Sequence, residues 1–180
     1  MQTGMVLYPV AYPGFMWELI SGKFTRIPAQ AIVAKYMLDI GVRIDDSHLF
    51  VDRVGISYSQ IAKAVGKDKQ IVSATVQTIK RDKELYNIYS NLLPTCNLKN
   101  VAKVMGWDVL ELTLSDPAKS GVLGGIATAI GETGISIRQA IGEDPTFSTG
   151  LLYIITENPI PGEVLKKLQR IEGVEKVALI

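Results

Sequence analysis

The stretch ISYSQIAKAVGKDKQIVSATVQTIKRDKEL, residues 56–85, predicts two helices joined by a tight glycine turn. Ser57 is a favourable N-cap, and Gln60 follows at capping-box spacing, so we expect the first helix to begin there. Gly66 is expected to end this helix, because glycine readily adopts the left-handed conformation of a helix C-terminus. A second helix is expected over 69–84, which completes the outline of a helix-turn-helix.

The second of these helices carries two contrasting faces. Val72, Val76 and Ile79 have the spacing of one buried stripe. The opposite stripe is polar, contains no acid and is flanked by basic residues. Glutamine recognises adenine edges, whereas lysine and arginine bind phosphates or guanine. A solvated helix that merely packs is the alternative reading; the candidate DNA-contacting residues are Lys67, Lys69, Gln70, Ser73, Gln77, Lys80 and Arg81.

Upstream of this pair, a proline-initiated helix is expected over 28–41, followed by a short hairpin formed by 42–44 and 49–54. Residues 1–15 are expected to be an N-terminal extension. Their apolar run is interrupted by prolines and has no basic start, so we expect neither a signal peptide nor a membrane span.

Charge is distributed unevenly along the chain. Residues 1–106 contain 13 Lys and Arg against 8 Asp and Glu, whereas residues 107–180 contain 6 against 10. A basic half joined to an acidic half suggests two modules with different partners. We expect a helix-turn-helix domain over 16–93, a linker helix over 94–106 and a second domain over 107–180.

The C-terminal half alternates between strand and helix patterns. Strands are expected at 109–114, 135–141, 150–157 and 174–180, with helices in SGVLGGIATAIGETG and PGEVLKKLQRIE. The order is βαββαβ, the split-βαβ or ferredoxin-like pattern. The expected class is therefore α+β, with a helical N-terminal module before this domain.

The sequence offers no catalytic constellation. Cys96 is the single cysteine and His48 the single histidine, so an intrachain disulfide is excluded and a Cys/His metal site is not expected. No nucleophile, base and orienting group occur together. We therefore expect no enzyme activity, no metal and no cofactor, and a reducing, cytoplasmic location.

The segment GISIRQAIGEDP, residues 134–145, places polar side chains inside an isoleucine strand. Arg138 can pair with Glu143 or Asp144, or it can bind a ligand carboxylate in a bidentate manner. Gln139 lies on the opposite strand face, so the two serve one pocket equally only if a bulge intervenes.

The C-terminal half resembles an ACT domain, through VLELTL, the loop SDPAKSG, the helix GVLGGIATAI, the strand opening GISI and the closing VEKVALI. From about Met16, the whole chain resembles archaeal proteins described as predicted regulators of amino-acid metabolism. ISIRQAIGEDP, TENPIPGEVLKKL and VGKDKQIVSATVQTI carry this fuller resemblance. It implies an amino-acid sensor that works as a dimer. Ser120 stands where many such domains have proline, and Ser136 where they often have Asn.

The resemblance and the residue chemistry together suggest one ligand site. Amides at a helix start bind anions, and acids accept an ammonium group. The candidate ligand-binding residues are Asp116, Gly121, Val122, Leu123, Ser136, Arg138, Gln139, Glu143 and Asp144.

The expected function is that of a ligand-responsive regulator that binds double-stranded DNA and an amino acid. Homodimerisation is expected through the C-terminal module, because VLELTL, GLLYIITE and VEKVALI are long and apolar for exposed edge strands. Two other functions stay open: a regulatory subunit that binds a biosynthetic enzyme, and an ACT-like protein used only for assembly.

Overall fold

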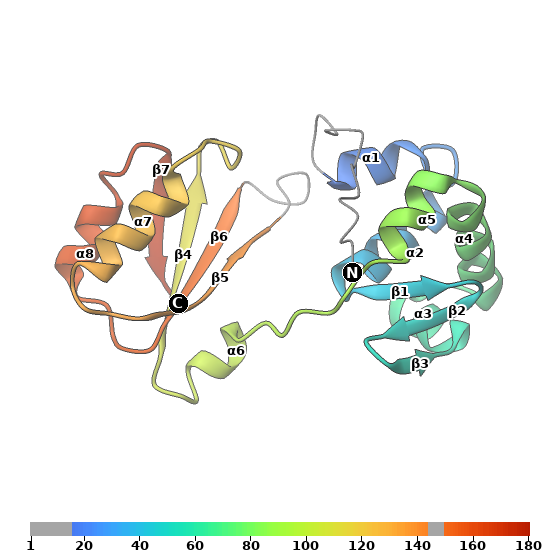
Figure 1. Ribbon diagram of the computed structural model, residues 1–180, viewed down its shortest axis with the longest axis horizontal. Coiled ribbons are helices and arrows are strands. Elements are labelled where there is room, and N and C mark those ends of the chain that lie inside the picture. The colour runs from blue at the N-terminus through green and yellow to red at the C-terminus, as the bar shows by residue number, and fades with distance from the viewer. Residues whose placement is uncertain (1–15, 144–149) are drawn as a thin grey trace, which may run out of the picture. The chain divides into compact units, whose positions relative to one another are not determined.

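The computed structural model describes residues 16–143 and 150–180, and the chain divides into two compact units, Met1–Thr95 and Cys96–Ile180 (Figure 1). The described residues form helices and two antiparallel sheets, which confirms the α+β class. None of the helices in these residues is both long enough and apolar enough to cross a membrane.

The first unit packs helices against a small three-stranded sheet that lies at one side of the unit (Figure 1). Its elements are α1 (Met16–Gly22), α2 (Pro28–Asp39), β1 (Val42–Asp45), β2 (His48–Val51), β3 (Val54–Ile56), α3 (Tyr58–Val65), α4 (Lys69–Arg81) and α5 (Lys83–Tyr89). The expected hairpin is thus a three-stranded meander in the order β1-β2-β3. The predicted strand 49–54 is split because Asp52 adopts a left-handed conformation, with φ of 54°, in a second tight turn.

The local signals around α3 act as predicted. Ser57 and Gln60 form both hydrogen bonds of the capping box, and Gly66 ends α3 with φ of 63°. Val72, Val76 and Ile79 of α4 are fully buried in the core of the first unit.

The predicted helix 69–84 is wrong at its C-terminal end, because it breaks at Asp82. Asp82 is extended, and its carboxylate accepts hydrogen bonds from the backbone N–H groups of Glu84 and Leu85, which starts α5. Lys23 also contacts this carboxylate, at 2.8 Å. The break turns α5 so that Leu85 and Tyr89 enter the core, where the Tyr89 hydroxyl donates to the Ala34 carbonyl at 2.8 Å.

The second unit has the element order βαββαβ after a short helix. Its elements are α6 (Lys99–Ala102), β4 (Asp108–Leu114), α7 (Val122–Gly131), β5 (Ile137–Gly142), β6 (Leu151–Thr156), α8 (Gly162–Leu168) and β7 (Val174–Leu179). The strand order is β5-β6-β4-β7. Two of the three strands expected at exposed edges, β4 and β6, are therefore interior strands, and the edges are β5 and β7.

Helices cover both faces of this sheet to different extents. On one face, α7 and α8 lie side by side over Leu110, Leu112 and Ile154 (Figure 1). On the other face, Ala102 of α6 is buried against Val109, Tyr153 and Ile155. The segment predicted as a linker helix thus packs on the sheet of the second unit from Cys96 onward.

A bulge in β5 changes which face its side chains occupy. The pairing with β6 shifts register between Ile137 and Gln139, which leaves Arg138 as the extra residue. Ile137 consequently packs with the α7–α8 face, whereas Ile141 packs with the α6 face. The odd-numbered isoleucines of the sequence do not share one side of the sheet.

Candidate functional site

The surface of α4 opposite its buried stripe is open to solvent. Gln70, Ala74, Gln77 and Arg81 are exposed there, at the three- and four-residue steps of a single helical face. We call these four residues the open face of α4. Of the predicted DNA-contacting residues, the structure places Gln70, Gln77 and Arg81 on it, and Ser73 is half-buried at its margin.

Lys80 is not part of the open face, because its ammonium group is hydrogen-bonded within the first unit. It donates to Asp46 Oδ1 at 2.6 Å and to Ser47 Oγ at 2.9 Å, in the turn between β1 and β2. This hydrogen bond and the charge of Lys80 hold the pKa of Asp46 below its ordinary value. Tyr86 accepts the Asp46 N–H, and Tyr58 donates to the Ser47 carbonyl. Lys80 therefore links α4 to the turn between β1 and β2.

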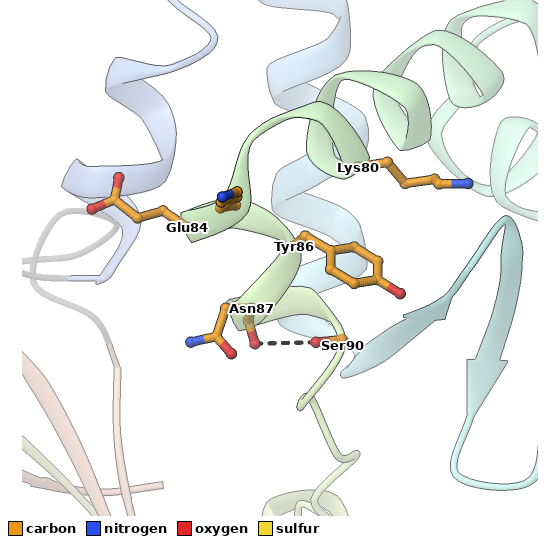
Figure 2. Close-up of a pocket in the computed structure, with 6 residues that line it drawn as sticks. Lys80, Glu84, Tyr86, Asn87 and Ser90 are labelled. Carbon is orange, nitrogen blue, oxygen red and sulfur yellow. Dashed lines mark hydrogen bonds between the residues drawn. The ribbon is translucent and has the colours of Figure 1, made fainter. Parts of the chain in front are cut away.

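A cavity of about 510 Å³ lies beside Lys80, at the junction of α4 and α5. Figure 2 shows Lys80 and Tyr86 extending towards the strands, whereas Glu84 points away from them. Residues at the C-terminal end of α5 form part of the cavity wall. There the Ser90 hydroxyl donates to the Asn87 carbonyl at 3.3 Å (Figure 2). Glu84 is also paired with Lys23, at 2.9 Å. Lys80, Glu84 and Tyr86 of the lining thus already have partners within the first unit.

Ion pairing leaves the neighbourhood of α4 with a positive balance. Within residues 16–95, five of the acids are paired with basic partners: Asp39, Asp45, Asp46, Asp82 and Glu84. Lys63, Lys67, Lys69 and Arg81 form no salt bridge within the described residues; Asp68 lies between two of them in sequence. This part of the unit can therefore attract a polyanion.

In the second unit, the predicted ligand loop is organised by its own side chains. Asp116 Oδ1 accepts the Ala118 N–H at 2.9 Å, and Lys119 pairs with Glu172 at 2.6 Å, which lowers the pKa of that glutamate. Gly121, with φ of 88°, precedes α7, and among the described residues no side-chain hydrogen bond caps the start of this helix. Amides at a helix start are suited to binding an anion.

Val122 and Leu123 differ in their surroundings. The Val122 side chain is buried in the core, so only its backbone is suited to a ligand. Leu123 is 49% exposed.

The remaining predicted ligand residues divide between the two ends of the sheet. Strands β4 and β5 both run antiparallel to β6, so they run parallel to each other. The loop after β4 and Glu143 after β5 therefore share one end, and Ser136 and Arg138 lie at the other. One chain does not bring these two groups together. Asp144 lies outside the described residues.

Arg138 and Gln139 have different partners, although Trp107 beside Arg138 and Leu98 beside Gln139 both pack on the α6 face of the sheet. Arg138 contacts Glu157, rather than Glu143, at 3.5 Å, and its guanidinium carbon lies 5.8 Å from the ring centroid of Trp107. The Gln139 amide is committed to the fold, since Nε2 donates to the Cys96 carbonyl at 2.7 Å and Oε1 accepts the Leu98 N–H at 2.9 Å.

Sequence reasoning missed the partners of these polar residues. Asp46 and Lys80 are 34 positions apart, and Gln139 and Cys96 are 43 apart. No short-range pattern links such pairs. For Gln139, the sequence signal was a polar side chain in an otherwise apolar strand.

Comparisons with known proteins find no matching family model and no matching curated protein. Among solved structures, the chain is similar to the one described as the crystal structure of PH0061, with 13% identity and a TM-score of 0.28. That alignment covers 84% of this chain and 88% of the other.

Proposed function

We propose that this protein is a ligand-responsive, DNA-binding regulator of amino-acid metabolism. In this proposal the first unit is a helix-turn-helix module that contacts DNA through α4. The second unit is an ACT-like, ferredoxin-like domain that senses an amino acid and dimerises. The protein acts by binding and has no catalytic role.

The open face of α4 is the observation that carries this proposal. Gln70 and Gln77 are two turns apart, about 10 Å along the helix axis at 1.5 Å per residue. That separation corresponds to about three base pairs at 3.4 Å each, so both amides fit base edges in one major groove. In this proposal, Lys67, Lys69 and Arg81 contact the phosphates beside those base pairs.

The exposed edge of the sheet in the second unit supports the sensing half of the proposal. Strand β5 is an edge strand. If two β5 strands paired antiparallel, Ser136 and Arg138 of one copy would lie at the sheet end that carries the other copy's loop and the start of α7. The groups that one chain separates would then form a site for a carboxylate, with Asp116 or Glu143 near its ammonium.

A binding selection from random duplexes tests the DNA claim with full-length protein. Gln77→Ala is expected to cost about 1–3 kcal/mol on the selected site and little on random DNA. Lys69→Ala is expected to weaken both and to lower the salt dependence by about one unit. Lys166→Ala, the same charge change on α8, is the control.

Failure to enrich any sequence, together with equal salt dependence for the Lys69 and Lys166 variants, would favour the enzyme-docking function instead. The sensing claim is tested separately by a melting-temperature screen of the amino acids and by light scattering. If no amino acid raises the melting temperature of a dimeric protein, the assembly-only function is favoured.

A further inference from the structure

The first unit holds the connecting segment as far as Pro94. Leu92 packs against the core of this unit. Pro94 lies directly on Gly41, where an added Cβ would be 2.7 Å from the Pro94 Cα and 2.8 Å from the Leu93 carbonyl carbon. Only a residue without a side chain permits this approach of one backbone to another. The end of the first unit is therefore fixed by packing rather than by hydrogen bonds.

The second unit holds the same segment from Cys96 onward. Gln139 Nε2 donates to the Cys96 carbonyl at 2.7 Å, and Gln139 Oε1 accepts the Leu98 N–H at 2.9 Å. We call these two hydrogen bonds the Gln139 contact. The Leu98 side chain also packs on the α6 face of the sheet. Thr95 is left between the two sets of contacts; it is exposed and takes part in no hydrogen bond of the described residues.

The bulge in β5 is what brings the Gln139 side chain to this segment. Gln139 pairs with Ile155, which belongs to the α6 face, whereas Ile137 packs with the α7–α8 face. Residues two apart in a regular strand share one face. Without Arg138 as the extra residue, Gln139 would therefore follow Ile137 to the α7–α8 face and could not reach the start of the second unit.

We propose that the Gln139 contact controls how far the two units can move relative to each other. With the contact formed, Thr95 alone is free, and the Cα atoms of Pro94 and Cys96 are at most about 7 Å apart. With the contact broken, the chain first meets the second unit at Leu98. The free stretch is then 95–97, and it spans up to about 14 Å from Pro94 to Leu98.

The Gln139 contact can open while the second unit stays folded. It is made by a side chain, whereas β5 pairs with β6 through backbone groups that this side chain does not supply. Cys96 is exposed, so water can replace the amide that leaves its carbonyl. The second unit can therefore tighten or release the connection to the first unit without any change in its own core.

The test measures how much of the magnetic alignment of the second unit reaches the first unit in the full-length protein. A lanthanide tag is attached through Lys166→Cys, an exposed position on α8, and Cys96→Ser removes the natural thiol. Backbone N–H residual dipolar couplings are then recorded in both units. We expect the first unit of this parent protein to retain at least about half of the alignment. Gln139→Met should lower that fraction about twofold or more, because three free residues form a flexible linker.

Two further variants control for side-chain chemistry and for the length of the connection. Gln169→Met makes the same change at an exposed position outside the connecting segment, and it should leave the fraction unchanged. Insertion of Gly-Ser after Thr95 lengthens the connection while the Gln139 contact stays in place, and it should lower the fraction as Gln139→Met does. The fit of the couplings within each unit shows whether that unit is folded.

Two results overturn the proposal. One is a parent protein whose first unit is aligned to the same extent as that of the Gly-Ser variant, because the length of the connection would then not govern the motion. The other is an equal fraction in Gln139→Met and Gln169→Met. The first comparison does not use Gln139→Met, so it decides the question even if that variant fails to fold. Neither DNA nor an amino acid enters the test, so its result does not depend on the proposed function.

Discussion

Replacing Gln139 by methionine should release the start of the second unit from its sheet. Methionine keeps the length of the side chain but removes the donor to the Cys96 carbonyl and the acceptor for the Leu98 N–H. Cys96 is exposed and water can replace the lost partner there, whereas Leu98 is only partly exposed. With about 0.5–1.5 kcal/mol for each hydrogen bond, we expect a loss of about 1–2 kcal/mol.

Amide hydrogen exchange measures this loss where it arises. A decrease of 1–2 kcal/mol in the free energy of local opening corresponds to roughly 5- to 30-fold faster exchange at Leu98. The amides of β4 and β6 should exchange at their original rates, because β4–β6 pairing does not involve Gln139 and the pairing of β5 with β6 uses only its backbone, which the substitution keeps. Glu143→Gln, a change at the other end of β5, is the control. Unchanged exchange at Leu98, or equal acceleration throughout the sheet, would refute the reasoning.

Three further predictions concern caps, charge and backbone conformation. Asp82→Ala should destabilise the first unit by about 1 kcal/mol in urea unfolding, and Asp82→Asn by less, because asparagine also caps helices. Lys80 holds the pKa of Asp46 below its ordinary value in the folded state, so this pairing stabilises the fold above the ordinary pKa and is lost as pH falls through the lowered pKa. Lys80→Gln should therefore raise the pKa of Asp46 in an NMR titration, and an unchanged value would contradict the pairing. Gly41→Ala should cost about 2–5 kcal/mol, because φ is +67° and the new Cβ would lie 2.7 Å from backbone atoms. Gly124→Ala, inside α7 with nothing within 4 Å, should instead stabilise by about 0.5–1 kcal/mol; unfolding curves that show equal effects would contradict both.

The strands of the second unit show which structural features the sequence patterns predict and which they do not. Their existence and order follow from apolar runs bounded by turn residues, and the structure has the same order. The positions of β4 and β6 inside the sheet do not follow from those runs. An apolar strand is suited equally to an interior position and to a protein interface, so its composition does not distinguish them.

The candidate DNA-contacting surface shows the same limit at the level of single residues. Spacing along α4 placed Gln70, Gln77 and Lys80 on one polar stripe. The structure keeps both glutamines open and turns Lys80 towards Asp46. A helical wheel places side chains by angle alone. Whether a long side chain such as Lys80 forms an ion pair depends on the turn that packs beside it.

The sequence by itself determined the features that depend on a few consecutive residues. The capping box at Ser57, the left-handed end of α3 at Gly66 and the buried stripe of α4 all arise within one or two helical turns. Only the tertiary structure decided the bulge at Arg138 and the attachment of Gln139 to Cys96 and Leu98. These features join segments far apart in the chain, and their geometry exists only after the strands have paired and the cores have packed.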